Sequence, residues 1–308
     1  MILMANKINR IYIGAICNRD LDIFEKLKSF CYTNYNIKVI NLLIKGLNPF
    51  NIKKKIQKKM KKYAFSLFIV KLLSRDSNQV IYDTLNEMAP NIPVLNSLNS
   101  VRMCEHRSQT FNFIERRCKK LSIPKSYYSI HDASIAIKNG VKIMIKLDTH
   151  NIPNLPKNDR IIGIPKNISQ FKEMVKKYKE ENLFFQEYLG KFDLIYKIYV
   201  IDRWAVSITS HNRLTQNENL SPLELVHIRV PIDKQFKRRI LRFGRKIGMT
   251  TFGIDYIVNN DGNPYIVDVN DFPSFRRVPE AISLLSDYIY NTITSRQVLI
   301  RTLVKAKS

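Results

Sequence analysis

The sequence of 308 residues predicts a mixed α/β and α+β protein built from three lobes. Short apolar runs alternate with helical patterns at the start of the chain, which favours a parallel sheet with crossover helices. After Pro124 the pattern changes to short strand-like pieces, and from Leu183 onward longer strands of period-two or continuous apolar character follow. We therefore expect an N-terminal α/β lobe (1–97), a small central α+β lobe (98–182) and a C-terminal, mainly antiparallel lobe (183–308).

The N-terminal lobe is predicted from an alternation of strands and helices. In chain order these are Ile11–Ile16, Leu21–Phe30, Lys38–Ile44, Ile52–Met60, Phe65–Val70 and Val80–Met88. A new helix is expected to begin after Asn99 or Ser100, which are both good N-caps. Its inner face would carry Met103, Phe111, Ile114 and Leu121. Neither GxGxxG nor GxxxxGK[ST] occurs, so this lobe is not predicted to be a dinucleotide or Walker-type phosphate site.

The other two lobes are predicted from strand patterns. The central lobe is expected to contain strands Ser126–Ile130, Val141–Leu147 and Arg160–Ile164 and a helix, Ser169–Glu180. The C-terminal strands are expected at Leu183–Leu189, Leu194–Ile201, Trp204–Thr209, Leu225–Val230, Gly253–Val258 and Pro264–Val269, with the basic helix Asp233–Ile247 packed on them. Asn260-Asp261-Gly262-Asn263 joins the last two strands, and Asp-Gly favours the positive φ of a tight hairpin turn.

The composition is strongly basic. The chain has 51 Lys and Arg against 26 Asp and Glu, a net charge of +25. Such a surplus attracts anions, whether nucleic acid, anionic membrane or small polyphosphates. Biased codon usage can produce the same Ile-, Asn- and Lys-rich composition, so both interpretations stay open. In the densest run, Lys53–Lys62, the apolar residues Ile56 and Met60 follow Ile52 on one helix stripe, which favours a solvated basic face there.

The chain is predicted to be cytoplasmic. The apolar run in Met1–Ile16 is far shorter than a membrane span and polar residues interrupt it, so neither a signal peptide nor a transmembrane helix is expected. Cys17, Cys31, Cys104 and Cys118 show no CxxC spacing and no histidine at metal-ligand spacing. They are expected to be reduced thiols, and no zinc site is predicted.

The predicted hairpin carries an unusual set of oxygen-bearing side chains. Asp268 and Asn270 are two residues apart and therefore share a face, and hairpin pairing can bring Asp255 to the same face. Their neighbours are apolar, and burying two carboxylates is costly unless a cation compensates them. A divalent cation with oxygen ligands is the natural compensation. The alternative is that Asp268 and Asn270 cap a turn before Pro273, although so apolar a run disfavours it.

Four short motifs follow one another in the C-terminal half. They are Gln186-Glu187-Tyr188-Leu189, Lys197-Ile198-Tyr199-Val200, Gly253-Ile254-Asp255 and Asp268-Val269-Asn270-Asp271-Phe272-Pro273. With the order of the lobes, this set resembles the ATP-grasp superfamily, in which a Rossmann-like lobe precedes the two ATP-grasp subdomains. Within it the chain is most similar to inositol polyphosphate kinases of the inositol 1,3,4-trisphosphate 5/6-kinase type, and next to RimK-like amino-acid ligases. The likeness to the kinases also includes Ile69-Val70-Lys71-Leu72, Arg107, the step from Gln186 to Lys197 and the run Phe272–Pro279.

The resemblance implies ATP and one or two Mg²⁺ ions as cofactors. Asp255, Asp268 and Asn270 would hold the metal. The stretch Gln186, Glu187, Tyr188 and Leu189 would bind the nucleotide, with the backbone of Glu187 to Leu189 as the hinge for adenine. Arg107 and Lys146 would hold the phosphates. For Lys146 the alternative is an edge-strand lysine that reaches water.

The resemblance also suggests catalytic and substrate residues. Lys197 would bind nucleotide and lie between it and the acceptor, and a catalytic role is expected for Lys197 and Arg213. Arg213, Arg276 and Arg277 are candidates to bind the anionic groups of the acceptor, since guanidinium groups suit phosphate and carboxylate, and Lys71 is a further candidate substrate residue. For the three arginines a solvated surface position is the alternative.

Two departures from the family pattern concern the acceptor and the phosphate-covering loop. Asp148–Arg160 contains no glycine, where ATP-grasp enzymes usually carry a glycine- and serine-rich flap. We expect this loop to be open and turnover to be slow or dependent on acceptor. His150, Asn151 and Asn154 are the candidates to replace the flap's backbone contacts. Where the inositol kinases carry His-Gly-Gly, this chain has Lys191-Phe192-Asp193, so the acceptor pocket is expected to differ.

Three functions follow from these features. The leading one is transfer of the γ-phosphoryl group of ATP to a hydroxyl of an anionic small molecule. The second is RimK-like carboxylate–amine ligation through an acyl phosphate, with the same nucleotide and metal residues. The third, from another class, is a catalytically weak nucleotide- or RNA-binding protein. Nucleic acid is the less favoured partner, because the aromatic residues lie mostly within apolar strands rather than among basic residues. No oligomeric state is predicted.

Overall fold

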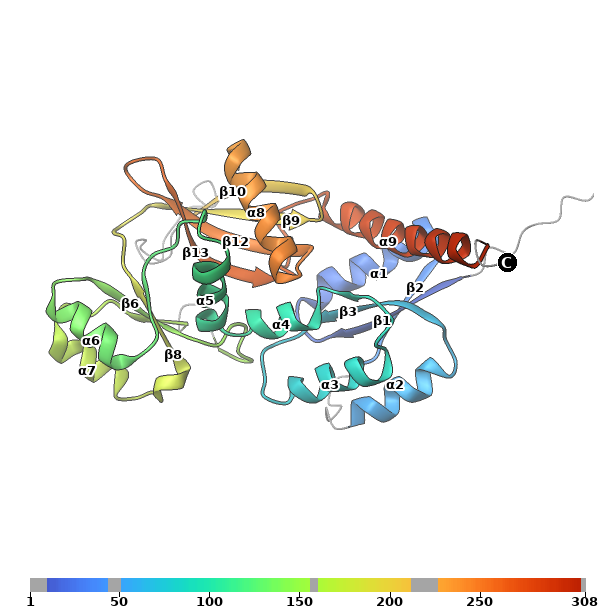
Figure 1. Cartoon of the computed structure of the whole chain (residues 1–308), viewed down its shortest axis with the longest axis horizontal. Helices are drawn as coiled ribbons and strands as arrows, with labels where there is room; N and C mark the ends of the chain where they lie inside the picture. The colour runs from blue at the N-terminus through green and yellow to red at the C-terminus, as the bar shows by residue number, and fades with distance from the viewer. Residues whose placement is uncertain (1–9, 44–50, 156–159, 212–226, 306–308) are drawn as a thin grey trace, which may run out of the picture. The chain divides into compact units, whose positions relative to one another are not determined.

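The computed structural model describes residues 10–43, 51–155, 160–211 and 227–305, which form two compact units. The first unit comprises the described residues of Met1–Leu72, Asp76–Leu98 and Ser274–Ser308, and the second those of Leu73–Arg75 and Asn99–Pro273. Figure 1 follows the chain through both units. The division into three lobes stays a prediction.

The first unit is built on a parallel sheet with the strand order β2-β1-β3-β4. Its strands are β1 (Ile11–Cys17), β2 (Ile37–Asn41), β3 (Phe65–Lys71) and β4 (Val94–Leu95). Its helices are α1 (Leu21–Tyr35), α2 (Ile52–Met60), α3 (Asn78–Met88) and α9 (Ala281–Lys305). The chain passes from β1 to β2 on one side and then to β3 on the other, so the topological switch point lies between β1 and β3. The predicted parallel sheet with crossover helices is confirmed.

Helices cover both faces of this sheet. Helix α1 contacts α9 and α2 contacts α3, and Figure 1 shows the two pairs on opposite faces. The central strands are therefore apolar almost throughout: Ile13 and Ile16 of β1 and Phe68 and Ile69 of β3 are fully buried.

The second unit contains two sheets, of which the smaller has the order β5-β8-β6-β7. Its strands are β5 (Ser126–Tyr127), β6 (Ile143–Leu147), β7 (Ile161–Gly163) and β8 (Leu183–Glu187). Helices α6 (Ile130–Lys138) and α7 (Ile168–Val175) pack on it through a core that includes Ala133, Ile143, Phe171 and Phe185. Each helix begins at a side-chain cap, because Ser129 and Asn167 accept hydrogen bonds from the backbone N–H three residues on.

The larger sheet of the second unit is antiparallel, with the order β11-β10-β9-β12-β13. Its strands are β9 (Leu194–Ile201), β10 (Trp204–His211), β11 (Arg229–Val230), β12 (Thr251–Val258) and β13 (Pro264–Asp271). Helix α8 (Lys234–Ile247) packs on one face with α5 (Arg107–Arg117) beside it. A Cβ on Gly244 of α8 would lie 2.4 Å from the Phe252 ring, so glycine is needed for this close approach. The predicted antiparallel sheet with a basic helix on it is confirmed.

Three local predictions need correction, and one helix was missed. The single helix expected after Asn99 is two helices, α4 (Leu98–Cys104) and α5, because His106 is extended between them and bridges to Thr149. The strand expected at Ser126–Ile130 ends at Tyr127, and helix α6 begins at Ile130. Strand β8, expected in the C-terminal sheet, pairs instead with β5 and β6. Helix α9 was not predicted.

In the described ranges no helix is both long and apolar enough to cross a membrane. The four cysteines are free thiols, three of them buried.

Candidate nucleotide and metal site

The hairpin of β12 and β13 places the predicted carboxylates opposite each other. Asp255 pairs with Asp268 in the antiparallel register, and Gly253 pairs with Asn270. Directly opposed residues share a face, so Asp255, Asp268 and Asn270 lie on one side of the larger sheet. The turn that joins the strands has Gly262 at φ 78°, the positive φ that the Asp-Gly pair predicted.

The other face of the same strands is apolar. Ile254 pairs with Val269, and both are fully buried in the core that α8 covers. The alternation along each strand therefore separates an apolar face under α8 from a polar face that carries the carboxylates. The carboxylates and the amide are half-buried.

Positive side chains from three further elements surround the two carboxylates. Lys197 on β9 pairs with Asp255 in register, and its ammonium forms an ion pair with the Asp255 carboxylate. At the start of α5, the Nε of Arg107 lies 3.3 Å from Oδ1 of Asp268. Lys146 on β6 is 6% exposed, and its Nζ donates to Val267 O at 3.1 Å and to Gln186 Oε1 at 2.8 Å. The edge-strand interpretation of Lys146 is therefore wrong, because its ammonium is buried.

His150, which the sequence indicated as a candidate to replace a flap contact, is also a member of this cluster. It is 2% exposed, and its Nε2 lies 3.3 Å from Oδ1 of Asp268. None of Arg107 Nε, His150 Nε2 and Asp268 Oδ1 has a partner with hydrogen-bond geometry among the described residues. Three buried polar atoms thus converge without satisfying one another, which is unusual in a folded protein.

Asp148 fixes the orientation of this cluster and was not predicted. It is 4% exposed, and its carboxylate accepts hydrogen bonds from Ser108 N at 2.7 Å and Ser108 Oγ at 2.9 Å. Its backbone carbonyl accepts from Arg107 N at 2.9 Å. The guanidinium of Arg107 also donates to the carbonyl of Leu147. These bonds fasten the start of α5 to the end of β6 and so set the position of Arg107.

Burial and charge shift the pKa values in the cluster. Burial, followed by the nearby Arg107, lowers the pKa of His150 to about 3, so this imidazole is neutral at neutral pH. Burial raises the pKa of Asp268, but the positive groups around it outweigh burial and lower it to about 2. Because His150 is neutral, the charges of Arg107, Lys146 and Lys197 keep Asp268 ionised. Burial also opposes the charge of Lys197, but Asp255 raises its pKa overall.

If Lys146 holds phosphate oxygens, as the resemblance implies, nucleotide binding is expected to depend on pH. Burial is the main cause that lowers its pKa to about 8. Its ammonium is charged below that pH and loses its charge as the pH rises through 8, so phosphate affinity is expected to fall by about tenfold between pH 7 and pH 9. Titrations of Mg-ATP at several pH values measure this. In Lys146→Arg the dependence should flatten, because arginine stays charged; an equally flat profile in the parent protein would contradict the prediction.

The predicted adenine hinge continues directly from β8. The backbone N–H of Glu187 donates to Lys125 O and that of Tyr188 to Lys142 O, each at 2.8 Å. Leu189 follows outside the strand, and its N–H donates to no backbone carbonyl in the described part of the chain. Gln186 is 2% exposed, and its Nε2 has no hydrogen-bond partner among the described residues. A backbone donor and a side-chain donor therefore remain available beside the strand end.

These residues fit a bound nucleotide with a divalent cation. Two carboxylates and an amide oxygen on one face are the donor types that Mg²⁺ prefers. The unsatisfied atoms around Asp268 and Gln186 indicate polar groups that a ligand would complete. Within the described ranges no three His, Cys, Asp or Glu side chains gather as a metal cluster, so Asn270 would be part of the ligand set.

The candidate acceptor residues belong to the first unit, where two of them meet. Lys71, at the end of β3, is 2% exposed, and its Nζ lies 3.2 Å from Oδ2 of Asp20. Arg276 contacts Oδ1 of the same Asp20 at 2.8 Å and also Asp22 at 2.7 Å. Arg277 is exposed. Arg213 lies outside the described residues.

Asp20 and Lys71 lie at the carboxyl ends of β1 and β3, which flank the topological switch point. In open α/β sheets ligands bind at this place. The carboxyl of Asp20 tends toward a raised pKa by burial, but Lys71 is the main cause that lowers it below its usual value. The sequence did not predict Asp20, which has a left-handed backbone at φ 52°.

Two asparagines of the glycine-free loop have a left-handed backbone. Asn151 has φ 49° and Asn154 has φ 61°, the positive φ that glycine adopts most easily. Asparagine is among the residues that tolerate this conformation best. Residues 156–159 lie outside the described part, so the openness of the loop stays a prediction.

The two asparagines are expected to respond differently to glycine and alanine. Asn151→Gly and Asn154→Gly should leave the free energy of unfolding within about 0.5 kcal/mol of the parent, because glycine adopts positive φ freely. Each Ala variant should lose about 1 kcal/mol, because alanine is strained there. Urea unfolding measures both sets. Equal stability of the Gly and Ala variants would contradict these φ angles.

No protein-family model matches the chain. The inositol-tetrakisphosphate 1-kinase of Xenopus laevis is 23% identical over 247 residues, which are 68% of this chain and 60% of that protein. The chain therefore spans about three fifths of the length of this curated relative.

Solved structures agree over nearly the whole chain. The D-alanine–D-alanine ligase of Bacillus anthracis complexed with ATP has a TM-score of 0.63 at 12% identity, covering 92% of this chain and 98% of that one. The RimK domain ATP-grasp protein of Sphaerobacter thermophilus has a TM-score of 0.62 at 13% identity, covering 90% and 98%. The fold predicted from the sequence motifs is confirmed: the chain has the ATP-grasp fold.

Proposed function

We propose that the chain is a Mg-ATP-dependent kinase that transfers the γ-phosphoryl group of ATP to a hydroxyl of an anionic small molecule. The observation that carries this proposal is the pairing of Asp255 with Asp268, where the positively charged side chains of Arg107 and Lys197 contact the two carboxylates. Phosphoryl transfer depends mainly on positioning and on charge stabilisation. A pair of carboxylates for a cation, with arginine and lysine for phosphate oxygens, supplies both.

The chain's own residues would bind and orient the nucleotide. The N–H of Leu189 and the side chain of Gln186 are the donors proposed for adenine. Arg107 and Lys146 would hold phosphate oxygens, and both are buried, so their charges act in a low-dielectric environment. Because Asp148 and Leu147 fix Arg107, its guanidinium needs little reorganisation when the phosphates bind.

Asp255, Asp268 and Asn270 would hold one or two Mg²⁺ ions. Held there, Mg²⁺ would supply positive charge that offsets the negative charge of the phosphates. Lys197 lies on the same face as Asp255 and is the group proposed beside the γ-phosphate, with Arg213 as a further catalytic candidate. The ammonium of Lys197 would stabilise negative charge on the transferred group.

The acceptor would be anionic. The relative from Xenopus laevis is by name a kinase of an inositol phosphate, which supports a phosphorylated polyol as the acceptor class. In the first unit, Lys71 and Arg276 share Asp20 at the switch point and are the groups proposed to exchange that carboxylate for an acceptor phosphate. Arg277 follows Arg276 directly and is the third candidate.

A ligase is the second candidate, and the solved structures favour it. Both structures named above are by title a ligase or a RimK domain ATP-grasp protein. A carboxylate–amine ligase would use the same nucleotide and metal residues and form an acyl phosphate. The glycine-free loop keeps a third candidate, a nucleotide- or RNA-binding protein with weak turnover.

Product analysis separates the three candidates. The protein is incubated with Mg-ATP and, in parallel, with inositol phosphates or with pairs of amino acids, and ADP, inorganic phosphate and product mass are measured. A kinase releases ADP without inorganic phosphate and adds one phosphoryl group to the acceptor. A ligase releases both in equal amounts and joins two substrates. ADP that forms at the same rate with and without every acceptor would contradict the kinase proposal.

If the proposed acceptor residues are right, Arg276→Ala combined with Arg277→Ala should raise the KM for the anionic acceptor by about tenfold or more. The KM for ATP should stay within about twofold. Lys54→Ala with Lys58→Ala removes the same charge from exposed positions of α2 and is the control. Equal effects of the two double variants on acceptor KM would argue against the assignment.

A further inference from the structure

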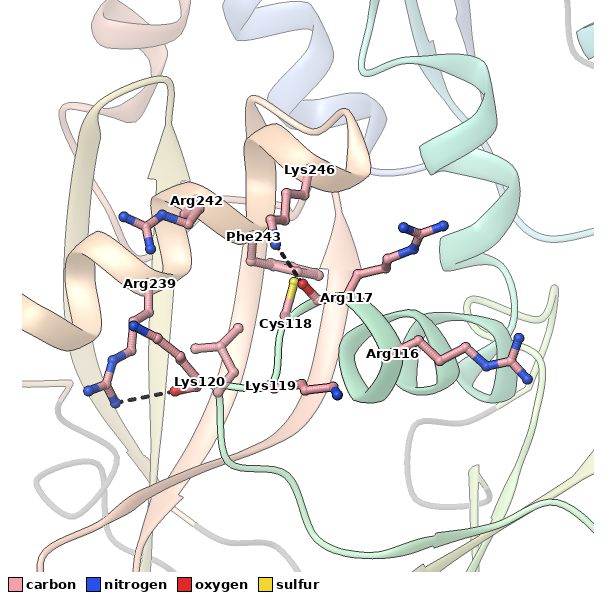
Figure 2. Close-up of a pocket in the computed structure, with 10 residues that line it drawn as sticks. Arg116, Arg117, Cys118, Lys119, Lys120, Arg239, Arg242, Phe243 and Lys246 are labelled. Carbon is pink, nitrogen blue, oxygen red and sulfur yellow. Dashed lines mark hydrogen bonds between the residues drawn. The ribbon is translucent and has the colours of Figure 1, made fainter.

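A strongly basic pocket lies in the second unit between the end of α5 and helix α8 (Figure 2). It has a volume of about 300 Å³. The side chains that line it are Arg116, Arg117, Cys118, Lys119, Lys120, Leu121, Arg239, Arg242, Phe243 and Lys246. The lining contains no carboxylate. Its large apolar members Leu121 and Phe243 are buried, and seven of its ten lining residues are Arg or Lys.

The sequence of α8 explains why its cations gather on the outer side. Phe236, Ile240 and Phe243 are buried against the sheet, and the positions between them are mostly Lys or Arg. Two of these cations, Lys246 and Arg239, form hydrogen bonds that join the two walls of the pocket. Lys246 Nζ donates to Arg117 O at 2.6 Å, and a terminal nitrogen of Arg239 donates to Lys120 O at 3.2 Å. Both bonds satisfy carbonyls at and beyond the end of α5 and hold the two walls together.

The remaining cations of the pocket form no ion pair among the described residues. Of these, Arg116, Lys119 and Arg242 are exposed. A group of cations on one surface raises the local concentration of anions. The pocket is therefore built to attract an anion.

This pocket is separate from the candidate nucleotide site. Helix α8 covers the face of the larger sheet that carries Ile254 and Val269, whereas Asp255 and Asp268 lie on the opposite face. Helix α5 links the two places: Arg107 at its start contacts Asp268, and Arg116 near its end lines the pocket. At 1.5 Å per residue these two positions are about 14 Å apart along the helix axis.

The positive surface extends beyond the pocket. Lys234, Arg238, Arg242 and Arg245 of α8 are all exposed and recur at helical spacing, so they form one stripe along the helix. From Lys234 to Arg245 the stripe is about 16 Å long. A single small anion would occupy only part of that length. A nucleic acid strand, with a phosphate about every 3.4 Å of helix axis, would match all of it.

We propose that the pocket and the stripe on α8 bind the phosphate backbone of a nucleic acid duplex. The arginines supply planar forks for phosphate oxygens. No exposed aromatic side chain lines the pocket, so bases have nothing to stack on and the binding is to the backbone, without sequence preference. An anionic membrane is the less suited partner, because the lining offers no exposed apolar side chain to insert.

The test measures binding of fluorescent RNA and DNA duplexes, two helical turns long, at a series of salt concentrations. The test variant combines Arg116→Ala, Lys119→Ala and Arg242→Ala. The control combines Lys54→Ala, Lys58→Ala and Lys61→Ala, which removes the same charge from exposed positions in and just after α2. All six side chains are exposed and outside the candidate nucleotide site, so both variants are expected to melt close to the parent.

The test variant should bind at least about tenfold more weakly, and the slope of log affinity against log salt should become shallower by about 2 to 3. The control should stay within about twofold. Equal losses in the two variants would overturn the proposal, because only net charge would then matter. Failure of the parent to bind either duplex at about 50 mM salt would also overturn it, as would binding to phosphatidylserine vesicles in place of both duplexes.

A competition experiment distinguishes this proposal from the proposed function. Saturating Mg-ATP should leave duplex binding unchanged, because the two sites lie on opposite faces of the sheet. Displacement of the duplex by Mg-ATP would place the nucleic acid at the nucleotide site and overturn the proposal. Loss of kinase activity alone would not affect it.

Discussion

Replacing Asp268 with Asn is expected to abolish the thermal stabilisation that Mg-ATP gives to the parent protein. At a ligand concentration about a hundredfold above Kd, binding adds about 2.7 kcal/mol to the stability of the native state. For a unit of this size, that raises Tm by roughly 5–10 °C. Asp268 is central to the proposed cation site, and its neutral replacement weakens both cation binding and the balance of charge around the phosphates.

The comparison must be made for each variant against its own unliganded form. Asp268 compensates the charge of Arg107, so Asp268→Asn leaves a buried guanidinium less well paired and should lower the unliganded stability by about 1–3 kcal/mol. Asp261→Asn, at the exposed turn of the same hairpin, is the matched control and should keep the full Mg-ATP shift. A full shift in Asp268→Asn would exclude this carboxylate from the site.

Replacing Lys197 with Met is expected to lower turnover by about 10²–10³-fold, the size of effect seen when one charge-stabilising group is removed from an active site. Methionine keeps most of the side-chain volume and removes the charge. Because Arg107, Lys146 and the N–H of Leu189, which Lys197→Met leaves unchanged, are the main groups proposed to bind the nucleotide, most of the Mg-ATP shift in Tm should persist. The two readouts together separate a role in the reaction from a role in nucleotide affinity.

The control for this prediction is Lys172→Met, an exposed lysine on α7. Its turnover should stay within about twofold of the parent. If Lys197→Met retained parental turnover, Lys197 would be a structural partner of Asp255 only. If it lost the Mg-ATP shift as well, its role would be in binding.

Much of the fold could be predicted because its signals are local. Helix α2 has the predicted bounds Ile52–Met60, since its apolar stripe is set by residues four apart. The β12–β13 hairpin follows from an Asp-Gly turn between two apolar strands. The start of α6 also had a local signal that was missed: Ser129 caps the helix and Asp132 follows three residues later.

Other features depend on contacts between distant parts of the chain. The break between α4 and α5 forms because His150 N donates to Glu105 O and Arg107 N to Asp148 O. No pattern around His106 shows these bonds. Strand β8 likewise pairs with β5 and β6, and its period-two pattern alone does not indicate which of the two sheets it joins.

In the candidate site, too, some features follow from local sequence patterns and others depend on contacts between distant residues. The shared face of Asp268 and Asn270 follows from period two, so it could be read from the sequence. The ion pair of Lys197 with Asp255 requires β9 to pair with β12, and local sequence patterns do not show this pairing of distant strands. His150 and Asp20 were missed as members of their clusters because each acts through a partner more than fifty residues away.

The most direct test of the central claim is a crystal structure of the parent protein with a non-hydrolysable ATP analogue and Mn²⁺, whose anomalous scattering locates the metal. Manganese is expected about 2.1 Å from oxygens of Asp268 and Asn270, with adenine beside the N–H of Leu189 and phosphates at Arg107 and Lys146. A metal peak away from the β12–β13 hairpin, or a nucleotide bound at another place on the protein, would contradict the account.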